Sequence, residues 1–365
     1  MEKNVFIPTF GNRPQPFVGR RIVLDNIMEG LAHPEGHPHR ATIVTGQRGT
    51  GKTALLLEIA VRAEEMGYAA INVTNSEKML GEILQLLYMK HGNYSKGKQK
   101  LKSINAGAFG FSFGLALSDD TQQNFGFRIH LSLLADELAK CGKGVLLLVD
   151  EVQSNTPEMR ELAVTYQHLV GEGKNIAIVM AGLPGAVSSV LHDDILTFLN
   201  RAHKVVLEPL DFADISLFYT ERFAIAGKKI APDVLDFVVR ATRGYPYLMQ
   251  LIGYHIIKFV GEAKTIEMQI AENAAITAKR DLTDSVHKTC LRPLSDKDIA
   301  FLKAMSKDKE GSRIADIQTR MKVSPSYIQQ YRLRLISAGI ILPERRGRIE
   351  FAVPYLGEYL RGELD

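Results

Sequence analysis

The chain contains no tryptophan, only two cysteines and no long hydrophobic run. Cys141 and Cys290 lie too far apart to form a disulfide framework or a metal-binding motif, so we expect a reducing, cytoplasmic location. No apolar stretch approaches the roughly 18 residues that cross a bilayer, and the first residues lack a signal-peptide pattern. A membrane partner is therefore not expected. A net charge of +4 permits a nucleic-acid partner without requiring one.

The hydrophobic fraction of 45% and the charged fraction of 24% are ordinary for a globular protein, and 365 residues allow two to three domains. Within residues 1–208, the chain from about residue 17 alternates short apolar runs with helical patterns. This alternation predicts an α/β domain with a parallel five-stranded sheet and helices on both faces. The predicted strands are 41–45, 68–73, 144–149, 175–180 and 203–207. The predicted helices between them are 52–65, 76–90, 127–140, 157–170 and 186–199.

Residues 209–292 lose the strand pattern, which predicts an all-helical second domain. Its helices are expected at 211–226, 232–242, 247–260 and 266–289. Residues 293–365 predict a third domain, in which Ser324 and Pro325 form a good helix start. Its expected elements are helices at 296–305, 313–321 and 326–337 and a hairpin around 345–348. Helix, turn, helix and hairpin in this order predict a winged helix-turn-helix domain.

One stretch of the first domain breaks the alternation of strands and helices. Residues 103–117 alternate small and apolar side chains with period two, which predicts a β-hairpin-like insertion near 94–126. Four lysines precede it, namely Lys96, Lys98, Lys100 and Lys102. The pattern leaves three roles open: a surface ornament, a contact between subunits, or a loop that touches DNA.

Residues 46–53 read Gly-Gln-Arg-Gly-Thr-Gly-Lys-Thr, which matches the P-loop pattern G-x-x-x-x-G-K-[ST] at every fixed position. A β-branched strand precedes this segment and a helix follows, so backbone N–H groups and the helix dipole converge on one anion site. The Lys52 ammonium is expected along the β- and γ-phosphates, and the Thr53 hydroxyl on Mg²⁺. The candidate nucleotide-binding residues here are Gly46, Gln47, Arg48, Gly49, Thr50, Gly51, Lys52 and Thr53.

A second motif, of the Walker B type, ends the apolar run at 145–149 with two adjacent carboxylates. Asp150 is expected to hold Mg²⁺ opposite Thr53, and Glu151 to orient or deprotonate the attacking water. The chain lacks the Asn-Lys-x-Asp segment that reads the base in GTPases. The two motifs together predict a site for ATP or ADP with Mg²⁺, in which Glu151 and Lys52 are catalytic.

Together with residues 17–20 (Phe-Val-Gly-Arg) and 243–246 (Arg-Gly-Tyr-Pro), these motifs resemble the AAA+ P-loop ATPases. The resemblance is to the initiator-like and archaeal-ATPase-like group, which is related to the STAND switch ATPases. It covers nearly the whole chain and implies that residues 209–292 form a helical lid beside the nucleotide.

The resemblance also implies roles for single residues. Those expected near the adenine are Val18, Gly19 and Arg20. Pro246 would approach the nucleotide from the lid, and Arg201 would act as an arginine finger between subunits. Each role has an ordinary structural alternative. Residues 17–20 can fasten the N-terminus to the core, and Arg201 can interact favourably with a helix dipole as a cation at a helix C-terminus. Gly244 and Pro246 can mark a helix boundary.

The chain departs from the family pattern in two places. The fourth predicted strand runs into Ala181, Gly182 and Leu183, where many family members carry a polar sensor residue. No Arg or Lys occupies the first turn after Pro246, where a second sensor often lies, although Arg243 stands just before it. Both departures leave nucleotide binding intact and favour a slow, switch-like ATPase over a motor.

The third domain carries 13 Lys and Arg against 10 Asp and Glu from Leu294 onward, so its net charge of +3 is mild. One face of its third helix is apolar, with Ile328, Tyr331 and Leu335, and the opposite face is polar. Gln and Arg read base edges, and wing arginines suit phosphates or a minor groove. The candidate DNA-binding residues are Ser326, Gln329 and Arg332 in the helix, and Arg345, Arg346 and Arg348 in the wing.

These patterns predict an ATP-dependent switch with double-stranded DNA as its partner. One alternative is a regulatory switch whose nucleotide is mainly structural and whose winged helix binds a protein. Another is an accessory ATPase of a mobile element. A homo-oligomer stays open in each case.

Overall fold

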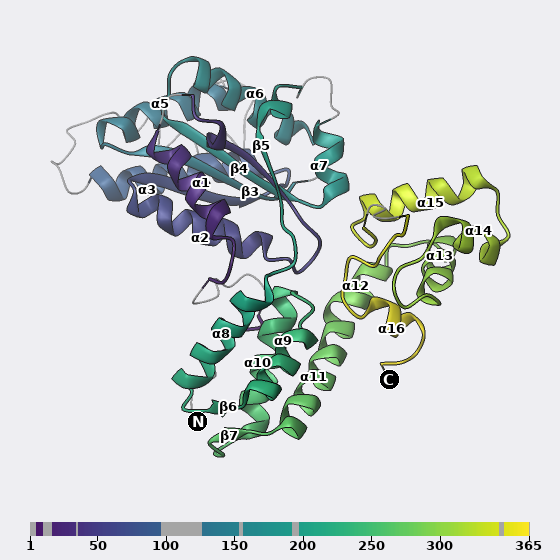
Figure 1. Ribbon diagram of the computed structural model, residues 1–365. Coiled ribbons are helices and arrows are strands. Elements are labelled where there is room, and N and C mark those ends of the chain that lie inside the picture. The colour runs from purple at the N-terminus through teal and green to yellow at the C-terminus, as the bar shows by residue number, and fades with distance from the viewer. Residues whose placement is uncertain are drawn as a thin grey trace.

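The computed structural model describes residues 5–9, 17–33, 36–95, 126–152, 156–191, 197–342 and 347–364. Figure 1 shows three units that follow one another along the chain: an α/β unit at the top, a helical unit below it and a smaller unit at the right. The predicted insertion near 94–126 lies almost entirely outside the described residues. Within these ranges, no helix combines the length and the apolar character that a membrane crossing needs.

The α/β unit is built on a sheet with the strand order β2-β3-β4-β1-β5. The strands are β1 (Ala41–Thr45), β2 (Tyr68–Thr74), β3 (Gly144–Val152), β4 (Ile176–Gly182) and β5 (His203–Val206). Every pairing is parallel, which confirms the predicted sheet. The central strands are continuous apolar runs because both of their faces are covered, and all seven residues of β4 are buried.

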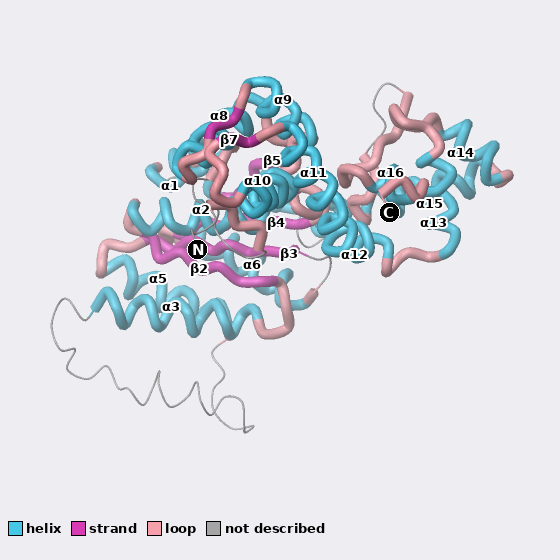
Figure 2. Tube along the Cα trace, turned by 90° about the horizontal axis from the view of Figure 1, so that it is seen from below, coloured by secondary structure: helices cyan, strands magenta, loops and turns pink. Residues whose placement is uncertain are grey.

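Helices cover both faces of the sheet, as predicted. On one face, α1 (Arg21–Ala32) and α2 (Lys52–Glu65) pack against strand residues such as Val44 and Leu148. The other face, which includes Ile43 and Leu147, is covered by α3 (Met79–Ser95), α5 (Phe127–Lys140), α6 (Pro157–Gly171) and α7 (Pro184–Leu191). Figure 2 shows α3 and α5 on one side of the strands and α1 and α2 on the other.

The predicted single helix at 186–199 is wrong. α7 ends at Leu191, and a separate 3₁₀-helix follows at Thr197–Arg201. Buried Leu199 continues the apolar pattern into this second element. A 3₁₀-helix has three residues per turn, and so short an apolar pattern does not distinguish that period from 3.6. Arg201 is therefore the last residue of a 3₁₀ turn that leads into β5.

The second unit, which we call the lid, consists mainly of helices. They are α8 (Phe212–Ile225), α9 (Pro232–Ala241), α10 (Pro246–Val260), α11 (Met268–Leu282) and α12 (Lys288–Leu291), with a π-helical turn at Thr283–His287 between the last two. The prediction of an all-helical unit is wrong in one detail, because β6 (Lys229–Ile230) and β7 (Thr265–Ile266) pair in parallel. Two-residue strands are too short to show a period of two in the sequence.

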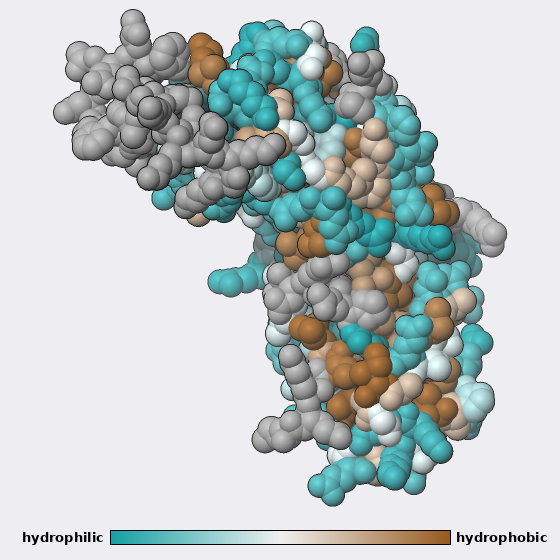
Figure 3. Space-filling view, turned by 90° about the vertical axis from the view of Figure 1, so that its left-hand side faces the viewer, coloured by the Kyte–Doolittle hydropathy of each residue, from teal (hydrophilic) through white to brown (hydrophobic). Residues whose placement is uncertain are grey.

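The outer face of the lid is partly apolar. Figure 3 views the molecule from the left of Figure 1 and shows hydrophobic residues among hydrophilic ones on the lower, lid part of that face. Leu217 and Ile225 of α8 are 60% and 66% exposed. Single exposed apolar residues are common, so these two do not define an interface by themselves.

The third unit, called here the C-terminal unit, contains α13 (Asp296–Ser306), α14 (Ile314–Met321), α15 (Pro325–Ser337) and α16 (Leu356–Leu360). Its first three helices lie where the sequence predicts them. Ser324 caps α15 as expected, because its hydroxyl accepts the N–H of Tyr327. Antiparallel bridges join Ser312 to Ile349 and Ile341 to Phe351. The assignment of this unit as a winged helix stays a prediction.

The lid and the C-terminal unit share one continuous hydrophobic core. It runs from Phe6 through lid residues such as Phe223 to Phe301 and Leu356 in the C-terminal unit. The sheet has two separate cores of its own, one on each face. Phe6 reaches the lid core from the N-terminal segment, and a Cβ on Gly253 would lie only 2.3 Å from its ring.

We expect Phe6→Ala to destabilise the lid, because the ring is 2% exposed and fills a site in a well-packed core. The cost of such a truncation is about 3–5 kcal/mol. Urea unfolding followed by circular dichroism measures it. Ile7→Ala is the matched control, since Ile7 is 41% exposed. Equal midpoints for the two variants would contradict an anchoring role for Phe6.

Candidate nucleotide site

The P-loop joins β1 to α2 through backbone conformations that require glycine. Gly49 and Gly51 have φ values of 75° and 90°, which L side chains rarely adopt. Gly51 is also the N-cap of α2, so the first N–H groups of the helix begin directly after the loop. Strand, loop and helix thus form the anion cradle that the sequence predicts at residues 46–53.

The Lys52 ammonium is held inside this loop. Its Nζ donates hydrogen bonds of 2.8 Å to the carbonyl oxygens of Gly46 and Gln47. Burial lowers the pKa of Lys52 to about 8, although nearby Asp150 works in the opposite direction. A phosphate that binds in the loop would therefore compete with two carbonyl groups for this ammonium.

Thr53 and Asp150 meet at the edge of the sheet, as the motifs predict. The Thr53 hydroxyl donates a 2.6 Å hydrogen bond to Oδ2 of Asp150, and Asp150 is 7% exposed. A hydroxyl and a carboxylate are oxygen ligands of the kind that Mg²⁺ prefers. The donor set fits a magnesium ion between these two side chains and a nucleotide.

The end of β3 carries a bulge at the two carboxylates. The register between β3 and β4 shifts between Val149 and Val152, so Asp150 and Glu151 oppose a single position of β4. Glu151 has a φ of 52°, and its N–H donates to Oδ1 of Asp150 at 2.8 Å. Bulges and positive φ values re-aim side chains and gather at functional sites. Here the bulge leaves Asp150 buried and turns Glu151 outward, where it is exposed.

Residues 17–20 line the boundary between the sheet and the lid. A cavity of about 50 Å³ there is lined by Val18, Arg20, Gly51 and Pro246, among others. The structure thus brings together residues that the resemblance places near the adenine. Gly19 has a φ of 67°, and a Cβ on it would lie 2.8 Å from the Leu210 side chain.

Arg20 also has a structural part at this boundary. Its guanidinium donates to the backbone carbonyl of Glu208, in the segment that connects β5 to the lid. Burial lowers the pKa of Arg20, while Glu208 and Asp214 act against that shift. Arg20 therefore fastens the N-terminal segment to the segment that connects β5 to the lid.

Tyr245 is the functional candidate that the motifs missed. Its hydroxyl donates to the carbonyl of Arg48, and a Cβ on Gly49 would lie 2.1 Å from that hydroxyl. Burial raises the pKa of Tyr245, which keeps the hydroxyl protonated as a donor. The neighbouring glycine and proline drew attention to this turn, but no sequence signal marks the tyrosine as the contact between lid and P-loop.

The two arginines named as further candidates lie elsewhere. Arg201 is exposed at the end of its 3₁₀ turn, and its role in a neighbouring subunit stays a prediction. Arg243, considered as a substitute sensor, contacts residues of the C-terminal unit instead. Its guanidinium forms an ion pair with Glu358 at 2.5 Å and lies 3.9 Å from the ring centroid of Tyr355.

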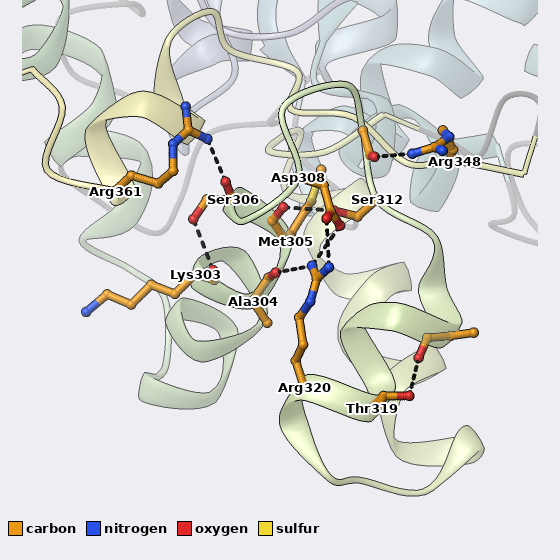
Figure 4. Close-up of polar contacts among 12 residues, drawn as sticks. Lys303, Ala304, Met305, Ser306, Asp308, Ser312, Thr319, Arg320, Arg348 and Arg361 are labelled. Atoms are coloured by element: carbon orange, nitrogen blue, oxygen red, sulfur yellow. Dashed lines mark hydrogen bonds and ion pairs between the residues drawn. The ribbon is translucent and has the colours of Figure 1, made fainter.

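The candidate DNA-binding residues have different surroundings. Ser326 and Gln329 are exposed on α15. Arg332 is half-buried, and its Nε is shielded from solvent. Arg348 donates to the carbonyl of Gly311 at 2.8 Å (Figure 4). Arg345 and Arg346 lie outside the described residues.

An ion pair fixes the helices that support α15. Arg320 of α14 donates two 2.7 Å hydrogen bonds to the Asp308 carboxylate and one of 2.8 Å to the carbonyl of Ala304 (Figure 4). These bonds lower the pKa of Asp308. Because its guanidinium is engaged within the unit, Arg320 is a structural residue rather than a further candidate for phosphate contacts.

The parallel sheet, the P-loop between β1 and α2, and the paired carboxylates at the end of β3 define a P-loop ATPase fold of the AAA+ type. The model of an ATPase domain predominantly from Archaea matches residues 17–252, and the chain belongs to this family. A domain of unknown function matches residues 284–360. No curated protein matches the sequence.

Solved structures show the same fold over the full length of the chain. A Walker-type ATPase of Pyrococcus abyssi has a TM-score of 0.71 at 17% identity, covering 96% of this chain and 97% of that one. The ORC2 protein of Aeropyrum pernix, solved as ADPNP–ADP complexes, has a TM-score of 0.62 at 13% identity, covering 94% and 92%. Cdc6p of Pyrobaculum aerophilum has a TM-score of 0.52 at 18% identity, covering 100% and 98%. At such identities the likeness concerns the fold.

The pKa of Lys52 leads to a prediction about pH. Free Lys52 loses its proton near pH 8, and bound phosphates would raise that pKa, so binding at higher pH takes up a proton. The affinity for ATP should therefore fall as pH rises above about 8, by up to about tenfold per pH unit. Calorimetry at pH 7 and pH 9 in buffers of different ionisation enthalpy measures both effects. Lys52→Ala should bind weakly and without this dependence, and equal wild-type affinities at the two pH values would contradict the prediction.

Proposed function

We propose that this chain is a slow ATPase that acts as a conformational switch and couples nucleotide binding to double-stranded DNA through its C-terminal unit. The observation that carries the proposal is the cluster of Lys52, Thr53, Asp150 and Glu151 at one edge of the sheet, with Tyr245 of the lid seated on the same loop. This cluster supplies an anion cradle, oxygen ligands for a metal and a carboxylate base.

In the proposed mechanism, the loop N–H groups bind the phosphates and Lys52 exchanges two backbone carbonyls for phosphate oxygens. Thr53 and Asp150 would hold Mg²⁺, whose charge would offset that of the β- and γ-phosphates. Glu151 accepts the proton of the attacking water, and its outward orientation on the bulge leaves room for that water. Through its hydrogen bond to Arg48, Tyr245 would transmit a change in the loop to the lid.

The end of β4 supports a slow rate. Ala181 and Gly182 are buried and offer no polar side chain toward the nucleotide. The backbone carbonyl of Gly182 instead accepts the N–H of Gly46. A preorganised donor aimed at developing charge contributes several kcal/mol to a typical transition state, about 2.7–4 for one donor. Its absence at this position favours a switch over a motor.

A protein partner is the second candidate for the C-terminal unit. Leu333 is 57% exposed on α15, beside exposed Gln329 and Gln330. A large apolar side chain cannot form a hydrogen bond with a phosphate or a base edge. It can, however, be buried against an apolar protein surface. In this case the nucleotide would be mainly structural and turnover would not respond to DNA.

ATP turnover with and without duplex DNA tests the proposal. We expect DNA to stimulate the wild type, Lys52→Ala to lose binding, and Glu151→Gln to bind ATP while losing about 10²–10⁴ in rate. Glu161→Gln is the matched control, since Glu161 is exposed on α6. Tight ATP binding without turnover, indifferent to DNA, would support the protein-binding candidate instead.

The wing arginines make a separate prediction about salt. If Arg345 and Arg346 contact phosphates, replacing both with Ala should weaken DNA binding for every sequence. It should also flatten the slope of log affinity against log salt by about 1 per contact. Fluorescence anisotropy at several salt concentrations measures the slope. Lys258→Ala with Lys264→Ala is the control, because it removes the same charge from exposed lid positions. An unchanged slope in the arginine variant would count against a wing contact.

A further inference from the structure

Four histidines meet at the amino edge of the sheet, opposite the P-loop. His33 follows α1, His37 and His39 belong to the short 3₁₀-helix Pro38–Arg40 and its cap, and His203 begins β5. Successive ring centroids along this series lie 6.0, 5.3 and 4.1 Å apart. The sequence groups the first three, and the parallel pairing of β1 with β5 adds the fourth. We call these four rings the histidine cluster.

The cluster is not arranged as a metal site. Within the part of the chain that the structure describes, no group of three His, Cys, Asp or Glu side chains could hold a metal ion. Imidazole is the side chain whose charge ordinarily changes between about pH 5 and 8, and rings this close together repel one another once they are protonated. The cluster is therefore suited to respond to protons.

Two nitrogen atoms of the cluster require neutral rings. Nδ1 of His37 accepts the backbone N–H of His39 at 3.4 Å and thereby caps the 3₁₀-helix. A protonated ring has no lone pair at this nitrogen and cannot accept a hydrogen bond. Nδ1 of His39 is buried and has no hydrogen-bond partner among the described residues, so a proton at that atom would lack an acceptor.

The electrostatic surroundings of His39 favour its neutral form as well. Burial and the neighbouring rings of His203 and His37 lower the pKa of His39, while Glu29 of α1 acts in the opposite direction. Arg40, the next residue, directs its guanidinium to backbone carbonyl oxygens. A lowered pKa means that the folded protein binds this proton less readily than the unfolded chain. The stabilisation is therefore complete above about pH 6.5 and is lost as the pH falls below it.

β5 is the element that protonation of the cluster would affect. It lies at the edge of the sheet and pairs only with β1, over the short stretch from His203 to Val206. A strand at an edge leaves one row of backbone groups unpaired, so fewer ladder hydrogen bonds hold it than hold a central strand. Directly after β5, the N–H of Leu207 donates to the carbonyl of Thr45 at 2.7 Å, and the chain continues into the lid. Repulsion at the start of β5 thus acts on the strand that connects the sheet to the lid.

We propose that the histidine cluster is an acid-sensitive latch. Neutral rings hold the start of β5 against the 3₁₀-helix, and protonation in mildly acidic solution drives His203 away from His39 and loosens β5 together with its connection to the lid. The latch goes beyond the proposed function, because it involves neither the nucleotide site nor the C-terminal unit. It can be measured without nucleotide or DNA.

Hydrogen exchange at residues 203–207, compared at about pH 7.5 and about pH 5.5, tests the latch. The rates are corrected for the intrinsic pH dependence of amide exchange, and EDTA is present. Wild-type β5 should lose protection at the lower pH, by up to about tenfold for each unit by which the pKa of His39 is lowered. The central strand β3 should keep its protection.

Three variants separate the latch from a general effect of acid. His203→Gln removes the ring that faces His39, so the pH dependence of β5 exchange should flatten and the pKa of His39, followed by NMR, should rise. His203→Lys places a lasting charge there, so β5 should exchange at pH 7.5 as the wild type does at pH 5.5. His168→Gln is the matched control and should behave like the wild type, since His168 is exposed at the end of α6.

Two results would overturn the latch. One is an equal pH dependence of β5 exchange in the wild type and in His203→Gln, because the ring of His203 would then play no part. The other is an equal loss of protection in β3 and β5 at the lower pH, which would indicate unfolding of the whole sheet rather than release of its edge.

Discussion

The parallel pairing of β1, β4 and β3 is the constraint on which the site depends. The carboxyl ends of parallel strands meet at one edge of a sheet, so Thr53 and Asp150 touch although 97 residues separate them along the chain. β4 lies between the two strands, and the carbonyl of Gly182 at its end accepts the N–H of Gly46 in the P-loop. The sheet thus brings together the groups proposed to bind a nucleotide and a metal, while Ala181 and Gly182 at the end of β4 carry no polar side chain.

The parts that a contiguous pattern encodes could be predicted from the sequence: the five strands, the P-loop and the two carboxylates after β3. The remaining parts arise from contacts between distant residues. The bulge that turns Glu151 outward depends on the register between β3 and β4. The hydrogen bond from Tyr245 to Arg48 joins residues 197 positions apart, and the close approach of Gly185 to Ser337 joins two units. The helix at 186–199 was wrong because its apolar spacing fits two helix types.

Two groups that hold the P-loop differ in their response to protons. Burial raises the pKa of Tyr245, so its hydroxyl remains a donor to Arg48 throughout the physiological range. Burial has the opposite effect on Lys52, because its protonated form is the charged one, and its pKa of about 8 lies close to that range. The attachment of the lid to the loop is therefore insensitive to pH, whereas the charge of Lys52 is not.

The shared core of the lid and the C-terminal unit decides how far a nucleotide can act. A flexible linker would not transmit a rotation from one domain to the next. It would fix only the effective concentration of one domain near the other. Here Phe301 and Leu356 belong to the same buried cluster as Phe223 of the lid, and packed cores do not deform continuously. We therefore expect a movement of Tyr245 on the P-loop to reach α15 as a rigid-body displacement. This shared body also approaches the ATPase unit closely between α15 and α7, where a Cβ on Gly185 would lie 2.3 Å from the Ser337 carbonyl oxygen.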